Sequence, residues 1–179
     1  MKKNIIKAGL AVSALLASSI VFAQTDSEYF SSLTPQEAVK QSQAWRSEGK
    51  DTKVIITPTT IMAKFANQPA AEVPLGDVFF LSIAPWMTFT HPCTNHVPTG
   101  CTGELKNVSM MMTVKDVETG ETVTDGMVRT QNDGFIDLWL PRNKAFDVSF
   151  SYQGLMSTER LTTTNSSRTC ITTMKLKKA

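Results

Sequence analysis

The chain has 179 residues, of which 18 are basic and 16 acidic, so its formal net charge is +2 at pH 7. This length suits one compact domain, or a small domain joined to a larger one. Such a near-neutral charge gives no electrostatic basis for binding nucleic acid or a membrane surface, and neither partner is expected.

The first 23 residues have the layout of a secretory signal peptide. A basic start, MKKNIIK, precedes the apolar stretch AGLAVSALLASSIVF, and Val21 and Ala23 occupy the positions before a cleavage site. The apolar run 8–23 would extend about 24 Å as a helix, short of a bilayer core of roughly 30 Å. We therefore expect export and cleavage after Ala23. The mature chain, 24–179, loses three lysines and no acids, which leaves 15 basic and 16 acidic residues.

Residues 24–50 are predicted to be helical. In LTPQEAVKQSQAW, Thr34 is suited to be the N-cap and Pro35 to be the first helical residue. Glu37 follows three residues after the cap and completes the pattern of a capping box. The sequence therefore predicts a helix that begins at Pro35.

The next segment changes to β-branched and aromatic residues. The stretch KVIITPTTIMAKF predicts two short strands around Pro58. The following ANQPAAEVPLG, with its prolines and alanines, indicates a linker or an arm. We assign residues 24–80 to a small N-terminal α/β domain.

Residues 81–179 are predicted to form a β-sandwich. The stretch DGMVRTQNDGFIDLWLP indicates a hairpin, because Asp133 and Gly134 suit the positive φ angles of a tight turn. The stretch AFDVSFSYQG alternates and places four side chains on one face: Phe146, Val148, Phe150 and Tyr152. Short strands with regular turns indicate an antiparallel sandwich, immunoglobulin-like or prealbumin-like. The predicted fold class is α+β, mostly β, with a short helical and strand domain before the sandwich.

The loop HPCTNHVPTGC, residues 91–101, concentrates the metal-binding side chains. It holds both histidines of the chain, His91 and His96, and two of its three cysteines, Cys93 and Cys101. The third, Cys170, begins the last predicted strand. Because ends of first and last strands can meet in such folds, all three sulfurs are expected at one end of the domain.

Three thiolates with one or two imidazoles fit zinc or cuprous copper. Calcium and magnesium are disfavoured because the loop has no carboxylates, and iron–sulfur clusters usually need four cysteines. Thioethers also bind Cu(I), and Met110, Met111 and Met112 are consecutive. On a strand Met110 and Met112 share a face and Met111 takes the other, and core packing is the simpler role for each of the three.

Other interpretations of the cysteines stay open. A disulfide between Cys101 and Cys170 would close a loop of about 70 residues, worth roughly 4 kcal/mol, and would leave Cys93 as the odd thiol. Alternatively, the thiols bind metal when reduced and pair when oxidised. A nucleophilic pair of Cys93 and His96 is disfavoured, because no oxyanion hole or cleft can be named. An enzyme is not expected, apart from thiol-driven reduction of a metal.

The stretch HPCTNHVPTGCTGEL, with the signal peptide, the helical lead-in and the distant third cysteine, resembles the CueP family of periplasmic copper-binding proteins. The resemblance implies a periplasmic protein that holds copper, as Cu(I) or Cu(II), with the ligands Cys93, Cys101, Cys170, His96 and His91. It implies roles in copper tolerance and in supplying copper to a periplasmic Cu,Zn superoxide dismutase. It also implies a homodimer.

Because the periplasm is kept oxidising, copper loading is predicted to need a reduced form, supplied by a disulfide reductase or by prompt metal capture. The alternatives are a zinc-binding module, a thiol–disulfide or metal-reducing redox protein, and an interaction domain with an ordinary disulfide. The strand edges of KVIITPTTIMAKF and the segment ANQPAAEVPLG are the expected surfaces for self-association, because unpaired edges invite pairing.

Overall fold

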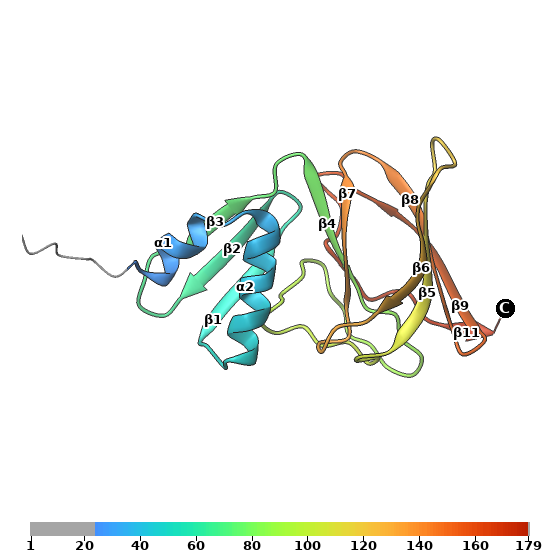
Figure 1. Ribbon diagram of the computed structural model, residues 1–179, viewed down its shortest axis with the longest axis horizontal. Helices are drawn as coiled ribbons and strands as arrows, with labels where there is room; N and C mark the ends of the chain where they lie inside the picture. The colour runs from blue at the N-terminus through green and yellow to red at the C-terminus, as the bar shows by residue number, and fades with distance from the viewer. Residues whose placement is uncertain (1–23, 179) are drawn as a thin grey trace, which may run out of the picture.

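The structure is a computed structural model, and it describes residues 24–178. The expected signal peptide and its cleavage after Ala23 lie outside this range. Within it, two short helices lead into a three-stranded sheet, and a β-sandwich follows (Figure 1). This arrangement confirms the predicted α+β, mostly β fold class. Among residues 24–178, no helix is long and apolar enough to cross a membrane.

The predicted helical region is two helices, α1 (Asp26–Ser31) and α2 (Pro35–Ser47). Each begins with a capping box. In α2 the Thr34 hydroxyl accepts from the Glu37 N–H, while the Glu37 carboxylate accepts from the Thr34 N–H at 2.9 Å. Both orphan donors are thereby satisfied, which confirms the predicted helix start at Pro35.

A three-stranded antiparallel sheet supports the helices. Its strands are β1 (Thr52–Ile56), β2 (Thr60–Phe65) and β3 (Ala71–Pro74), in the order β1-β2-β3. The segment ANQPAAEVPLG, predicted to be a linker or an arm, contains β3. Ala71 and Val73 are buried in the pattern of a half-buried strand, and Pro74 stands at the strand end, where its missing N–H costs little.

The sandwich consists of two facing sheets (Figure 1). The smaller sheet has the order β10-β4-β7, with β4 (Val78–Ile83), β7 (Ile136–Pro141) and β10 (Cys170–Ile171). The larger has the order β11-β9-β8-β5-β6, with β5 (Ser109–Asp116), β6 (Thr122–Arg129), β8 (Ala145–Tyr152), β9 (Leu155–Thr162) and β11 (Lys177–Lys178). Neighbouring strands are antiparallel, except that β10 runs parallel to β4.

The core between the sheets confirms the predicted alternation of β8. Phe146, Val148 and Phe150 are buried in it, and Tyr152 packs against it. Strand β4 differs from the others because both of its faces are buried: Leu81 faces the sandwich core, while its neighbours Phe80 and Ser82 face the N-terminal sheet and the loop at 91–101. The predicted boundary between the N-terminal domain and the sandwich, between residues 80 and 81, falls within this strand.

The predicted hairpin around Asp133 and Gly134 is wrong. The turn forms, with Gly134 at φ 87° and the Asp133 carboxylate accepting from the Phe135 N–H. However, β6 before it pairs with β5, and β7 after it pairs with β4, so the chain crosses here from one sheet to the other. Gly103 lies against the turn and donates its N–H to the Asp133 carbonyl at 2.6 Å. The turn residues determine the local backbone but not the partner of each strand.

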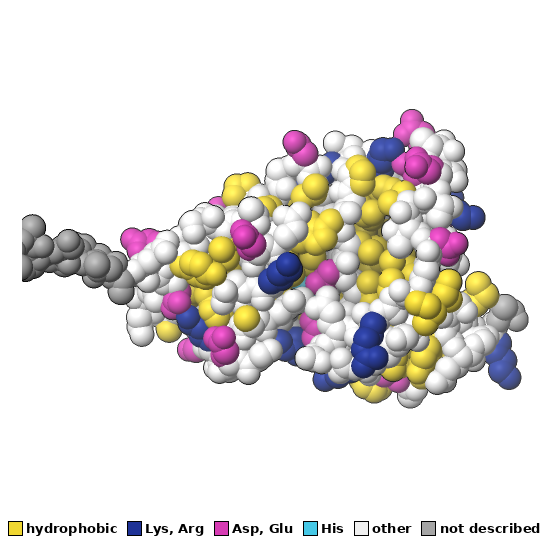
Figure 2. All heavy atoms as spheres, viewed as in Figure 1, with side chains coloured by type: hydrophobic (Ala, Val, Ile, Leu, Met, Phe, Trp, Pro, Cys, Tyr) yellow, Lys and Arg dark blue, Asp and Glu magenta, His cyan; other side chains and the backbone are white. Residues whose placement is uncertain are grey.

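On the face shown in Figure 2, basic and acidic side chains are interspersed over the surface. This distribution agrees with the small net charge of the chain.

Candidate metal centre

The loop 91–101 lies between the N-terminal sheet and the sandwich. The Ile56 N–H donates to the His96 carbonyl at 2.8 Å, and the Val54 N–H donates to the Thr99 hydroxyl at 3.0 Å. These bonds occupy the outer edge of β1. That edge is therefore paired within the chain and is not the free edge on which the predicted self-association relied.

Arg46, near the end of α2, holds the C-terminal end of the loop. Its guanidinium donates to the carbonyls of Pro98, at 3.2 Å, and Cys101, and to the Thr102 hydroxyl at 2.7 Å. It also lies 3.8 Å from the carboxylate of Asp133. The helix thereby fixes the position of Cys101 relative to the sandwich.

The three cysteines meet at one place, as predicted, but their pairing differs from the disulfide considered above. Cys93 is bonded to Cys170, and Cys101 is the free cysteine of the described chain. The Sγ of Cys101 lies 3.7 Å from that of Cys93. The Cys170 N–H donates to the Thr94 carbonyl, which brings β10 to the Cys93 end of the loop. Because Cys170 is bonded to Cys93, the alternative disulfide between Cys101 and Cys170 is wrong.

Cys101 is half-buried beside the disulfide. Burial raises the pKa of its thiol, against the opposing effects of a backbone hydrogen bond at Val97 and the positive charge of Arg46. The thiol is therefore protonated at neutral pH in this state, and a metal that binds it must displace a proton.

His96 is fully buried, with its ring 4.7 Å from that of Phe135 and 6.0 Å from that of Phe80. Burial in this apolar surrounding, with smaller contributions from Arg46 and His91, lowers its pKa to about 3. The imidazole is therefore neutral at physiological pH, which is the form that binds metals.

A hydrogen-bond chain determines which nitrogen of His96 carries the proton. The Ser82 hydroxyl donates to the Asp137 carboxylate at 2.7 Å and lies 3.3 Å from His96 Nε2. Because its single hydrogen is used, the hydroxyl accepts from Nε2–H, and this leaves Nδ1 unprotonated. Among residues 24–178, Nδ1 has no hydrogen-bond partner. A buried lone pair without a partner is costly unless a ligand or a metal uses it.

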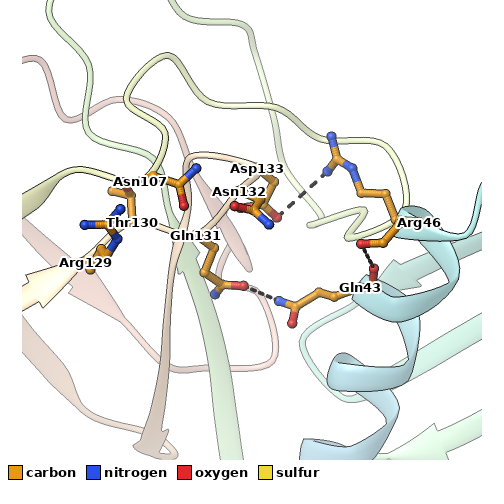
Figure 3. A pocket seen from close by; sticks show the side chains of 9 residues that line it. Gln43, Arg46, Asn107, Arg129, Thr130, Gln131, Asn132 and Asp133 are labelled. Carbon is orange, nitrogen blue, oxygen red and sulfur yellow. Dashed lines mark hydrogen bonds and ion pairs between the residues drawn. The ribbon is translucent and has the colours of Figure 1, made fainter.

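Asp137 is itself held by amide donors. Its carboxylate accepts from Gln131 at 2.8 Å and from Gln43, on α2, at 3.1 Å. Burial raises its pKa, and the hydrogen bonds from Ser82, Gln131 and Gln43 oppose the rise. Figure 3 shows Gln43 reaching from α2 toward Gln131, and Arg46 reaching toward Asp133, across a polar hollow of about 530 Å³.

Arg46, Ser82 and Asp137 were not predicted from the sequence. Ser82 and Asp137 face each other as a cross-strand pair of β4 and β7. Their only signal is a polar residue inside an apolar run, VFFLSI for one and FIDLWL for the other. Nothing in the pattern around Arg46 distinguishes it from other surface cations.

The five predicted ligands form two overlapping groups, each with its ligand atoms within 4.8 Å of one another. One is His91, Cys93 and Cys101, which are half-buried; the other is His96, Cys101 and Cys170, of which His96 and Cys170 are buried. Cys101 belongs to both. Thiol and imidazole groups in this arrangement are able to hold a soft or borderline metal ion.

Comparison with known proteins places this geometry in a family. The family model described as "Periplasmic copper-binding protein CueP" matches residues 37–175. A solved structure described as "Crystal Structure of S.CueP" matches with a TM-score of 0.75 and 29% sequence identity, covering 87% of this chain and 99% of that chain. No curated protein matches the sequence. The resemblance seen in the loop is thereby confirmed, and the protein belongs to the CueP family of periplasmic copper-binding proteins.

Proposed function

We propose that the protein binds Cu(I) as cargo through the thiolates of Cys93, Cys101 and Cys170, with Nδ1 of His96 completing the site. The observation that carries the proposal is the convergence of three sulfurs with a buried, neutral imidazole whose Nδ1 lacks a partner. Soft sulfur donors favour Cu(I), and a neutral imidazole binds it without losing a proton. Membership in a copper-binding family supports this choice of metal.

The disulfide closes this site. While Cys93 and Cys170 are bonded, two of the three sulfurs are not thiolates. Two electrons and two protons from a thiol reductant convert the bond into two thiols, and Cu(I) then displaces the protons. The partner that supplies the electrons is a disulfide reductase of the oxidising compartment, unless copper captures the newly made protein first.

His91 is proposed to serve the open side of the centre. It is half-buried and lies in the group with Cys93 and Cys101. A hollow of about 540 Å³ adjoins it, lined by Trp86, Thr90, Pro92, Arg168 and other residues. The ion is proposed to enter here before it reaches His96 on the buried side.

The wider roles follow from the family. Bound copper would be withheld from harmful chemistry, which contributes to copper tolerance, and would be passed to a periplasmic Cu,Zn superoxide dismutase. Self-association as a homodimer belongs to the same proposal. Because the edge of β1 is paired within the chain, we place the dimer contact elsewhere on the N-terminal domain.

The direct test is a titration of the fully reduced protein with Cu(I) against a competing chelator. Cys93→Ser, Cys101→Ser, Cys170→Ser and His96→Gln are each expected to weaken binding, and the oxidised wild type to show no thiolate binding. Met62→Leu, away from the centre, is the matched control. If no cysteine change weakens binding, the three-thiolate site is wrong. Elemental analysis of protein from the periplasm separates copper from zinc, because zinc also accepts three cysteines and a histidine.

A second function is supported by one contact. The free Cys101 sulfur lies 3.7 Å from Cys93, a member of the disulfide. Once it has lost its proton, the Cys101 sulfur can attack Cys93 Sγ, forming a bond between these two and releasing Cys170 as a thiolate that takes up a proton. This exchange moves the disulfide without net oxidation or reduction. For turnover, an external thiol reductant supplies two electrons to the disulfide, and two Cu(II) ions then take one electron each as two protein thiols form the bond again. Sustained turnover of Cu(II) reduction with excess thiol reductant would support it, whereas one stoichiometric event would favour binding alone.

A further inference from the structure

The two sulfurs of the disulfide differ in how far they can be reached from outside. Cys170 is fully buried in β10, in a small cluster with Ala84 and Phe135. Cys93 is half-buried and lines the hollow of about 540 Å³ beside His91. Because a thiolate must touch the sulfur that it attacks, a reductant reaches the disulfide of the folded protein at Cys93 and not at Cys170.

An exposed aromatic side chain stands next to this hollow. Phe89 is 62% exposed, whereas Phe79 and Phe80 are fully buried. Phe89 directly precedes Thr90, which lines the hollow. Further along the same lining are Trp86, His91 and Pro92. We refer to Trp86, Phe89, His91, Pro92 and Cys93 as the Cys93 surface.

The other exposed large hydrophobics of residues 24–178 lie elsewhere. One is Tyr29 on α1, and the rest lie on strands of the larger sheet: Met111, Val123, Met127 and Met156. Met110 and Met112 are buried in the core, as predicted, whereas the predicted core role is wrong for Met111, which is 41% exposed. In this group Phe89 alone is next in the chain to a residue that lines the hollow.

The segment that carries Phe89 is fixed to the rest of the protein. Before it, the Thr88 N–H donates to the Glu104 carboxylate at 3.0 Å. After it, the Thr90 hydroxyl donates to the Thr172 carbonyl at 3.1 Å. The exposed ring therefore stands on a backbone that is held on both sides, so a partner that packs on it does not have to order a loose loop.

The compartment determines the kind of reductant. The family is periplasmic, and the bacterial periplasm is not buffered by a pool of small thiols. Electrons for a disulfide there must come from a dithiol protein, which has to dock beside the sulfur that it attacks. Exposed aromatic side chains are enriched in such contacts between proteins. Arg168 also lines the hollow, and its positive charge favours the approach of an anionic thiolate.

We propose that the Cys93 surface is the docking site of a dithiol protein, and that the first thiolate of this protein attacks Cys93. The proposal rests on the proposed function, in which the disulfide is reduced before Cu(I) binds. It adds where the reductase makes contact and which sulfur it attacks.

The reaction has two steps. The partner's thiolate attacks Cys93 Sγ, so that a bond forms between the partner and Cys93 and the bond from Cys93 to Cys170 breaks. Cys170 leaves as a thiolate and takes up a proton. The partner's second thiol then loses its proton and attacks the partner's own sulfur, which releases Cys93 as a thiolate that takes up a proton. The partner is oxidised by two electrons to a disulfide, and this chain is reduced by two.

The attacked sulfur is identified by trapping the mixed disulfide. The probe is thioredoxin with its second active-site cysteine replaced by serine, so that it cannot complete the reaction. The substrate is oxidised Cys101→Ser, because the Cys101 sulfur, 3.7 Å from that of Cys93, would otherwise displace the probe. Peptide mapping by mass spectrometry is expected to find the probe on Cys93 in at least about tenfold excess over Cys170. An equal or larger share on Cys170, or no trapped product, would overturn the proposal.

The docking site is tested by the rate of reduction. Phe89→Ser should slow the reduction of the oxidised protein by intact thioredoxin about tenfold, because an aromatic contact is lost. Reduction by dithiothreitol should change by less than about twofold, since this small dithiol depends on access to the sulfur and not on docking. The matched control is Met127→Ser, which removes an equally exposed side chain from the larger sheet and should leave both rates unchanged. Equal slowing with both reductants, or no slowing with either, would refute the docking site.

This proposal and the proposed function can fail separately. After chemical reduction, Phe89→Ser should bind Cu(I) as the wild type does, because Phe89 belongs to neither ligand group. A failed docking test therefore leaves the three-thiolate site untouched. Conversely, if the chelator competition finds no such site, the trapped cysteine and the two rates of reduction still report on docking.

Discussion

The two sides of the cysteine cluster differ in how much of the fold holds them. On the inner side, His96 is buried between aromatic rings and bonded through Ser82 to Asp137, and Cys170 belongs to a strand. On the outer side, His91 and Cys93 lie half-buried in a loop beside a hollow. The inner side thus has its donor atoms set before any metal arrives, whereas the outer side is accessible to an ion or a reductant.

Cys101 joins these two sides. It belongs to both ligand groups, and its carbonyl is held by Arg46 from the N-terminal helix. Within one centre, affinity and access are thus divided between neighbouring residues. Preorganised donors contribute to affinity, and accessible donors contribute to the rates of loading and disulfide exchange.

The largest effect is expected on the pH dependence of stability, to which the buried inner histidine, His96, should contribute. Its pKa is about 3 when folded and about 6.5 when unfolded, so the unfolded chain binds a proton that the folded chain does not. The contribution is present above pH 6.5 and is lost as pH falls toward 3, at up to roughly 1.4 kcal/mol per unit. Urea unfolding of the oxidised protein between pH 7 and 4 measures it.

His96→Phe should flatten this dependence. Asp137 is common to the wild type and the variant. Its raised pKa acts in the opposite sense, because its stabilising contribution is lost as pH rises, so the difference between variants isolates His96. If the free energy of unfolding changes with pH at the same slope in the wild type and in His96→Phe, the distinction between the two sides is refuted.

The next largest effect is expected for the residue shared by both sides. Cys101→Ser in the reduced protein should lower Cu(I) affinity by about a hundredfold or more, because both ligand groups lose their common sulfur. Thr102→Ser, next in the chain, is the matched control for disturbance of the Arg46 contacts. An effect of Cys101→Ser no larger than that of its control would remove Cys101 from the centre.

The two histidines should then separate by kind of effect. His96→Gln is expected to lower Cu(I) affinity about 10- to 100-fold, because a preset donor is lost. His91→Gln should change the affinity by less than about threefold and instead slow the transfer of Cu(I) from a chelator, since it serves the entry side. Stopped-flow transfer and equilibrium competition on the same samples measure both quantities. A larger affinity loss for His91→Gln would reverse the assignment of the two sides.

Much of the fold could be predicted because its signals are local. The capping box at Thr34 and the alternation around Phe146 each follow from a few neighbouring residues, and both are confirmed. The errors concern which strands pair with each other. The turn at Asp133 forms, but its flanking strands belong to different sheets, and β3 depends on β2 as a partner rather than on its own composition.

The candidate site shows the same division. The loop ligands are close in sequence, so their clustering was visible, and Cys170 was expected to join them from the position of its strand. The pairing of Cys93 with Cys170 depends on the hydrogen bond from the Cys170 N–H to the Thr94 carbonyl. The spacing of the cysteines in the sequence does not reveal this contact. Ser82 and Asp137 meet only through the register of β4 and β7.

Removing the support of the inner histidine is expected to lower Cu(I) affinity less than removing the histidine itself. Ser82→Ala takes away the acceptor of Nε2–H, so the proton should distribute between both ring nitrogens. We expect Cu(I) affinity to fall by about tenfold, the lower end for loss of such a partner, because the tautomer that leaves Nδ1 unprotonated is still accessible. Ser149→Ala, which removes a hydroxyl from the outer sheet face, should change nothing.

Nitrogen-15 spectra of the imidazole distinguish this explanation from a loss of packing. In a His91→Gln background the only remaining histidine signal is that of His96, and its pattern should be Nε2–H alone before the serine is replaced. A mixed pattern should appear in Ser82→Ala, while the folded stability measured in urea falls little. If the parent protein already carries its proton on Nδ1, the lone pair does not point into the sulfur cluster and His96 cannot be a preset ligand. The metal would then depend on the outer side alone.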